Sequence, residues 1–142
     1  MKRPFVALAL TASFALSALF TALPASADPQ AVKETISRQL AAFRAGDAEA
    51  AYALAAPQIK RMFPSAERFI TMVRRGYPAV YGAGAPVFLR TQEIDTTHFA
   101  QEVALTDSEG AAWTALYTLA LQEDGSWQIS GCYLKKATGQ SI

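Results

Sequence analysis

The sequence is poor in the residues that most often carry recognisable chemistry. Cys132 is the only cysteine and His98 the only histidine among 142 residues. A lone cysteine cannot form a disulfide within the chain, and one histidine with one cysteine gives no ligand spacing for zinc. Glycine-rich phosphate loops, nucleophile motifs and paired carboxylates at helical spacing are also missing. These absences argue against the familiar kinds of catalytic and metal site, and we expect no metal and no cofactor.

The chain also lacks an excess of charge of either sign. Its formal net charge is +1, and loss of Lys2 and Arg3 would leave 11 basic against 12 acidic residues. Nucleic acids and anionic membranes attract proteins through clustered positive charge. We therefore expect neither nucleic acid nor an anionic membrane as a partner.

Residues 1–27 have the features of a secretory signal peptide. A basic start precedes residues 5–23, which carry no charge, and Ala25-Ser26-Ala27 has the small-x-small pattern of a cleavage site. We predict cleavage before Asp28 and an exported product, periplasmic or secreted, without stable membrane insertion. An uncleaved anchor is the alternative, because the apolar run is nearly long enough to span a bilayer. We expect residues 28–142 to form a single domain.

The first part of that domain has the periodicity of short helices. Apolar residues recur at spacings of four, four and three from Val32 to Phe43, which predicts one helical stripe. Caps and prolines mark the boundaries: Gly46 fits a C-terminal glycine, and Asp47 and Ser65 fit N-caps. The predicted helices cover residues 29–45, 48–56, a turn opened by Pro57 with inward-pointing Ile59, Met62 and Phe63, and 66–75.

From Ala79 onward the apolar pattern changes to alternation, which is typical of strands. We predict a short extended piece at 79–82 and strands near 87–95, 98–106, 111–122 and 126–134. Both faces of 111–122 are largely apolar, so we expect this strand to be central and covered on each side. Gly131 within the last strand indicates a bulge or bend.

Helices followed by an antiparallel meander predict an α+β fold. We expect the N-terminal helices to lie on one face of a curved antiparallel sheet of four to five strands. Such a cone, cystatin-like or nuclear transport factor 2-like in outline, tends to enclose a cavity between the sheet and the helices.

Tyrosines are the most suggestive candidates for a binding site. Buried tyrosines need partners for their hydroxyl groups, and a cluster of them can line a ligand cavity. Gln101 is a polar residue on the apolar face of its strand and would fit the same lining. The candidate ligand-binding residues are Tyr52, Tyr77, Tyr81, Gln101 and Tyr117. Tyrosine is more often a core residue with its tip in water, and that interpretation stays open.

Other polar residues have plainer explanations. His98 and Asp95 could act as base and orienter, but positions three apart on a strand face opposite ways, so a pair requires a turn between them. Cys132 has no flanking base that would lower its pKa, so we interpret it as a small apolar side chain. Arg68 and Arg75 lie on one helical face and could hold an anion, although solvation is the simpler interpretation.

The run from Gln39 to Tyr81, joined to Asp124-Gly-Ser-Trp-Gln-Ile-Ser-Gly-Cys-Tyr-Leu134, resembles a bacterial exported family grouped as domain of unknown function 4864. The resemblance covers residues 31–134 and implies no catalytic residue. The element order is more distantly similar to the nuclear transport factor 2-like superfamily, which includes SnoaL-like enzymes. The strand pair that those enzymes often insert between helices two and three is missing here, and no aspartate matches their usual base.

Three functions fit these features. The first is a non-enzymatic exported module that binds a small apolar or amphipathic ligand, or a protein partner, in the cone. The second is an enzyme of SnoaL-like type that uses a buried tyrosine or aspartate for proton transfer. The third is an oligomerising envelope protein in which the open sheet face forms a homodimer. Fold analogy cannot choose among them, because such cones serve as enzymes, carriers and docking modules alike.

Overall fold

The computed structural model describes residues 28–137, so the predicted signal peptide lies outside the described residues. Helices come first along the chain and strands follow. The helices are α1 (Pro29–Arg44), α2 (Ala48–Ala53), α3 (Pro57–Met62), α4 (Ala66–Gly76) and α5 (Pro78–Tyr81). The strands are β1 (Val87–Asp95), β2 (His98–Thr106), β3 (Ala112–Leu121) and β4 (Trp127–Lys136).

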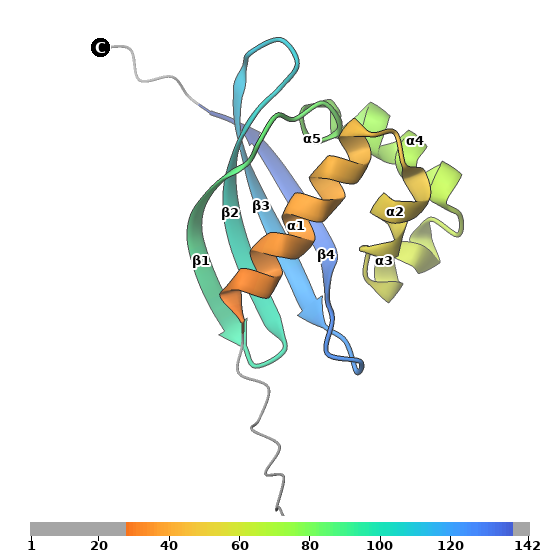
Figure 1. Ribbon diagram of the computed structural model, residues 1–142, viewed down its shortest axis with the longest axis vertical. Helices are drawn as coiled ribbons and strands as arrows, with labels where there is room; N and C mark the ends of the chain where they lie inside the picture. The colour runs from red at the N-terminus through yellow and green to blue at the C-terminus, as the bar shows by residue number, and fades with distance from the viewer. Residues whose placement is uncertain (1–27, 138–142) are drawn as a thin grey trace, which may run out of the picture.

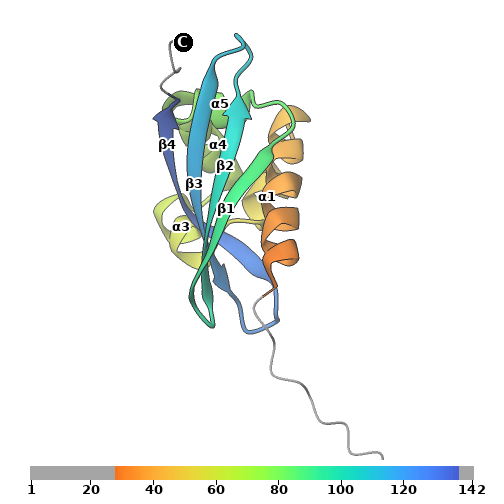
Figure 2. The same cartoon turned by 90° about the vertical axis from the view of Figure 1, so that its left-hand side faces the viewer.

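The four strands form one antiparallel sheet in the order β1-β2-β3-β4, a simple meander. The helices lie on one face of this sheet, with α1 crossing it obliquely, and no described residue outside the sheet covers the opposite face (Figures 1 and 2). The α+β class and the helix-on-sheet layers predicted from the sequence are therefore confirmed.

Local chemistry explains where the first helices begin and end. Asp28 caps α1 by accepting a hydrogen bond from the Gln30 amide at 3.0 Å, and Gly46 follows the helix with a φ of 67°. Asp47 accepts from the Ala50 amide at 3.0 Å, and Ser65 accepts from the Arg68 amide at 3.2 Å. The predicted caps are confirmed, and α2 ends at Ala53, three residues earlier than predicted.

The extended piece predicted at 79–82 is wrong, because Pro78–Tyr81 forms the helical turn α5. Pro78 stands at the first position of this turn, where its fixed φ favours a helix and its missing N–H is not needed. The amides of Val80 and Tyr81 both donate to the Tyr77 carbonyl at 3.0 Å. Ala79 and Val80 are buried, so their apolar character reflects the core and not a strand.

One hydrophobic core joins the helices to the inner face of the sheet. Trp127 is 6% exposed, and its ring meets that of Phe99 edge-on with centroids 5.1 Å apart. The expectation that β3 is covered on both faces is wrong. Leu116, on the outer face of β3, is 44% exposed, because the helices cover the inner face alone.

The last strand contains the predicted irregularity. Thr118 pairs with Gly131 but Leu119 pairs with Ile129, which leaves Ser130 as the extra residue of a β-bulge. A Cβ atom at position 131 would lie 2.9 Å from Thr118 Oγ1, so this position needs glycine. Next to the bulge, Ile129 exchanges backbone hydrogen bonds of 2.8 Å with Leu54 and Ala56, which ties the helical segment to the sheet edge.

Candidate functional site

A cavity of about 430 Å³ lies between the helices and the inner face of the sheet. This volume is within the range that small-molecule pockets occupy in proteins. The helical wall consists of Gln39, Phe43, Ala55, Ile59, Met62, Phe63, Phe69, Met72, Val73, Tyr77 and Val80. The sheet wall consists of Tyr117, Ile129, Ser130, Gly131 and Cys132. Every one of these residues is of an uncharged type, so the cavity suits an apolar guest better than an ion.

The residues of the cavity wall differ widely in burial. Met62, predicted to point inward, is 64% exposed, so that prediction is wrong and its side chain lies at the mouth. Phe43 and Tyr117 are 2% and 1% exposed and belong to the buried part of the cavity wall. The cavity therefore has a methionine at its entrance and an aromatic interior.

The short α3 helix explains why this space is not filled by the core. None of the six residues of α3 is fully buried, so the helix covers the cavity without filling it. Tyr52 fixes the end of α3, because its hydroxyl donates to the Phe63 carbonyl at 2.6 Å. The Tyr52 ring also lies 5.6 Å from the Phe69 ring. These contacts fix the end of α3 against α2 and α4.

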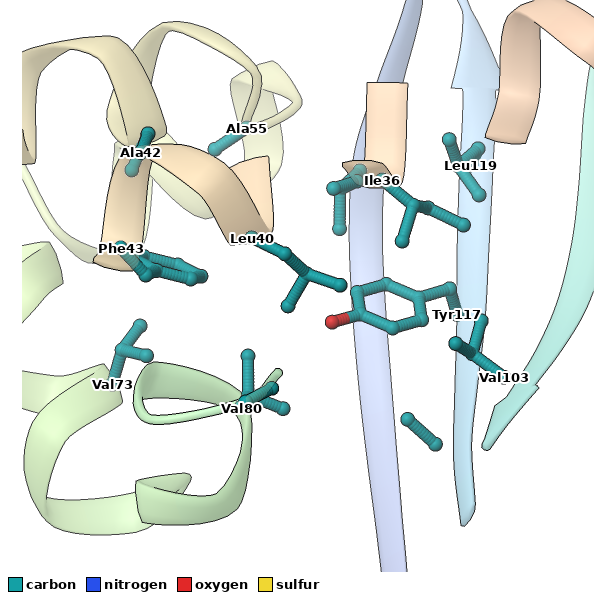
Figure 3. Packing of buried hydrophobic residues seen from close by; sticks show 14 of the residues in the cluster. Ile36, Leu40, Ala42, Phe43, Ala55, Val73, Val80, Val103, Tyr117 and Leu119 are labelled. Carbon is teal, nitrogen blue, oxygen red and sulfur yellow. The ribbon is translucent and has the colours of Figure 1, made fainter. Parts of the chain in front are cut away.

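Tyr117 is the most unusual residue of the site. Its side chain leaves β3 toward the helices, and its hydroxyl points into the space between α1 and the α4–α5 region (Figure 3). The hydroxyl oxygen is buried and has no hydrogen-bond partner among the described residues. Leaving a buried hydroxyl unpaired costs about 1–3 kcal/mol, so such groups are rare and need an explanation.

Burial fixes the protonation state of this tyrosine and of its neighbour. Desolvation, with a smaller contribution from nearby Cys132, raises the pKa of Tyr117 well above its ordinary value of 10.0. Burial also raises the pKa of the Cys132 thiol from 9.0 to about 12. The two residues are direct partners on β3 and β4, and a weak side-chain contact between the Tyr117 hydroxyl and the Cys132 thiol contributes to the pKa of both groups. At neutral pH the site offers one uncharged hydroxyl and one uncharged thiol.

The structure brings together two of the five candidate residues. Tyr77 and Tyr117 both line the cavity, from the α4–α5 junction and from β3. Their role in binding stays a prediction.

Tyr52, Tyr81 and Gln101 are not among the cavity-lining residues. Tyr52 uses its hydroxyl on the Phe63 carbonyl, and the Tyr81 ring lies under the Arg74 guanidinium at 5.3 Å. Gln101 is fully buried on the inner sheet face, as expected, but its amide is satisfied by the Thr91 hydroxyl and by the carbonyls of Arg90 and Glu102. These hydrogen bonds explain how the polar side chain of Gln101 can lie in the core.

Gln39 is a polar residue of the cavity wall that the sequence analysis did not identify as a site candidate. Its Nε2 donates to the Ala51 carbonyl at 3.1 Å, and the residue is 4% exposed. The signal was present, because Gln39 is three residues after Ile36 and four before Phe43, which places it on the buried stripe of α1.

The other polar candidates lie outside the cavity. His98 and Asp95 do meet, with Nδ1 2.8 Å from Oδ1, because the β1–β2 turn lies between them. Both side chains are about half exposed, and the pair stabilises the turn together with Thr97. Arg68 and Arg75 are exposed on α4.

Residues 28–137 contain no group of three or more histidine, cysteine, aspartate or glutamate residues placed to hold a metal ion. None of the helices described here is long and apolar enough to cross a membrane.

Comparison with known proteins gives a family but no activity. The chain matches none of the curated proteins at a significant level. A family model, Domain of unknown function (DUF4864), matches residues 25–142, which include every wall of the cavity. The match covers most of the chain, and it agrees with the resemblance seen in the sequence. The protein therefore belongs to the family described as Domain of unknown function (DUF4864).

Proposed function

We propose that this protein is an exported, non-enzymatic module that binds a small apolar or amphipathic molecule in the cavity between α3, α4 and the sheet. One observation carries the proposal: the cavity has a volume of about 430 Å³ and is lined by uncharged, mainly apolar side chains. Its aromatic and aliphatic walls would bind the apolar part of such a molecule.

The chemistry of the walls favours binding over catalysis. A SnoaL-like enzyme would need an acid or base next to its substrate, yet the residues that line the cavity include no aspartate, glutamate, histidine, lysine or arginine. Burial holds Tyr117 in its neutral form, because its pKa is raised. A carrier role therefore fits the lining of the cavity better than an enzymatic one.

Oligomerisation is the second candidate, supported by the outer face of the sheet. Leu116 and Tyr133 are cross-strand neighbours there and are 44% and 69% exposed. Adjacent exposed apolar residues on an uncovered sheet are typical of contact surfaces. A homodimer through this face would leave the cavity free, so the two functions are compatible.

Native mass spectrometry of the protein purified from its own host tests both candidates, because it reports bound molecules and oligomeric state together. We expect a non-covalent adduct on the wild-type protein. Val73→Phe adds a ring within the cavity wall and should remove the adduct. Val87→Phe is the matched control, since Val87 is 60% exposed on β1 and outside the cavity, and it should keep the adduct. Equal retention by both variants would contradict the proposed site.

Export is tested separately by the intact mass of the protein recovered from the host. Cleavage before Asp28 predicts a polypeptide of residues 28–142, in which Asp28 is both the N-terminal residue and the N-cap of α1. A mass that corresponds to all 142 residues would instead support an uncleaved anchor.

A further inference from the structure

The charges of the chain are unevenly distributed, and the basic ones gather on elements that enclose the cavity. Residues 57–81, which include α3, α4 and α5, and the strand β4 together hold seven of the eleven basic residues in the described part of the chain, but one of its twelve acidic residues. Figure 1 shows α3 and α4 at the β4 side of the sheet. These elements therefore carry positive charge outside an uncharged interior.

Arg68 and Arg75 lie on the side of α4 that borders the cavity. Residues three and four apart in a helix are neighbours on its surface. Arg68 is four residues before Met72 and Arg75 is three residues after it, and Met72 lines the cavity. Met72 is partly buried, whereas both arginines are exposed. The two guanidinium groups therefore flank a point where the cavity wall meets the solvent.

Neither arginine has a carboxylate as its partner. The ion pairs among residues 28–137 join β1 to β2, far along the chain from α4. Glu67 is the acidic residue of α4, but it is seven residues from Arg74 and lies on that side of the helix. Arg68 is in the first turn, where a positive charge opposes the helix dipole. Helix stability therefore does not account for Arg68, and an external anion would.

We propose that the ligand is a single-chain anionic amphiphile, with its alkyl chain in the cavity and its carboxylate, sulfate or phosphate head on Arg68 and Arg75. This inference rests on the proposed binding function. Guanidinium groups hold such oxyanions through paired, charge-assisted hydrogen bonds. At about 30 Å³ per non-hydrogen atom, the share of a water molecule in the liquid, the cavity has room for roughly a dozen atoms, enough for one chain but not for a two-chain lipid. The head stays in contact with water, so no charge is buried.

Three probes with the same octyl chain length test the charge of the head: octanoate, octanol and octyltrimethylammonium. Each is titrated into the purified protein at neutral pH and low salt, and binding is followed by two-dimensional amide NMR, with shifts expected at Gly131 and Cys132 in the sheet wall. We expect octanoate to bind about 3- to 10-fold more tightly than octanol, and octyltrimethylammonium to bind less tightly than either. Salt at about 1 M, which shortens the Debye length to about 3 Å, should remove most of this preference.

Arg68→Gln and Arg75→Gln should each reduce the affinity for octanoate, and the double variant should bind octanoate about as weakly as octanol. Affinity for octanol should not change. Arg74→Gln is the matched control, because it removes the same charge from the same helix, where Arg74 lies over the Tyr81 ring at 5.3 Å. It should leave all three affinities unchanged. All three arginines are exposed, and octanol binding reports whether each variant keeps the cavity.

The outcomes separate this inference from the proposed function. If none of the three probes binds, the proposed binding function itself fails. If octanol binds as tightly as octanoate, the cavity binds apolar molecules but the anionic class is wrong. If octyltrimethylammonium binds most tightly, the sign of the charge is wrong. Equal loss of octanoate affinity in Arg74→Gln and Arg75→Gln would contradict the position of the head.

Sedimentation with phosphatidylglycerol vesicles distinguishes a free amphiphile from a membrane surface. We expect the protein to stay in the supernatant, because the cavity has room for one chain. Co-sedimentation that is lost in the Arg68→Gln, Arg75→Gln double variant would assign the two arginines to a bilayer and overturn the proposal.

Discussion

Replacing Tyr117 by phenylalanine should make the free protein more stable, which is the opposite of what a change at a fully buried residue usually does. The ring keeps its place in the core, and the only atom lost is a hydroxyl oxygen that is buried without a partner. An unpaired buried hydroxyl costs about 1–3 kcal/mol, so its removal should raise the free energy of unfolding by a similar amount. A small loss of dispersion contacts, a few tenths of a kcal/mol, reduces the gain slightly.

Urea denaturation followed by circular dichroism measures this change. With an m-value of about 2 kcal/mol/M, which is typical of a small domain, a gain of about 1–3 kcal/mol should raise the midpoint by roughly 0.5–1.5 M. Tyr52→Phe is the matched comparison, because it removes the same atom from a tyrosine whose hydroxyl donates to the Phe63 carbonyl at 2.6 Å. That variant should lose about 0.5–1.5 kcal/mol.

We therefore expect the same substitution, tyrosine to phenylalanine, to raise the free energy of unfolding at position 117 and to lower it at position 52. If Tyr117→Phe destabilises the protein as much as Tyr52→Phe does, the Tyr117 hydroxyl has a partner in the free protein. The description of this hydroxyl as an unpaired buried group would then be wrong. A protein that keeps a costly unpaired group in its core gives up stability at that position, and such sacrifices are typical of functional sites.

Three further predictions concern the sheet. Trp127→Ala should cost about 3–5 kcal/mol in chemical denaturation, because the side chain is 6% exposed in the core; a loss below about 1 kcal/mol would contradict that packing. Gly131→Ala should destabilise the protein by about 1–3 kcal/mol, since the new methyl group would lie 2.9 Å from Thr118 Oγ1. Adding Thr118→Ala should recover much of this loss in a double-mutant cycle, and additive effects of the two changes would refute the clash. Cys132 and Tyr117 have folded-state pKa values above their unfolded ones, so their contribution to stability is complete below pH 9 and is lost as the pH rises toward about 12. Cys132→Ala should reduce this loss of stability at alkaline pH, measured as urea midpoints across that range. If the midpoints of the variant fall with pH as steeply as those of the wild-type protein, the thiol is not buried as described.

The sequence was most informative where structure is set by neighbouring residues. Asp47, Ser65 and Gly46 mark helix ends through hydrogen bonds or a positive φ within a few residues, and all three lie where their patterns predict. The alternation of residues 98–106 likewise identifies β2 without any knowledge of its partners. The signal peptide and the exported location are also local inferences, and they stay predictions because residues 1–27 lie outside the described part.

The errors occur where local patterns have two solutions. Residues 78–81 are apolar whether they form a strand or a buried helical turn, and contacts with the core decide in favour of the turn. The apolar side chain of Leu116 predicts a covered position, but every described helix lies on the opposite face of the sheet, so Leu116 is exposed. Met62 has an inward position on a helical wheel, yet α3 covers a cavity and not a filled core.

By itself, then, the sequence determined the order of helices and strands, the α+β class and most of the caps, because these depend on periodicity and on hydrogen bonds between near neighbours. The tertiary structure alone decided which tyrosines share a site. Five candidate residues look alike along the chain, but whether a hydroxyl has a partner depends on atoms that are distant in sequence. The Phe63 carbonyl satisfies Tyr52, whereas the Tyr117 hydroxyl is buried in the core without a hydrogen-bond partner among the described residues.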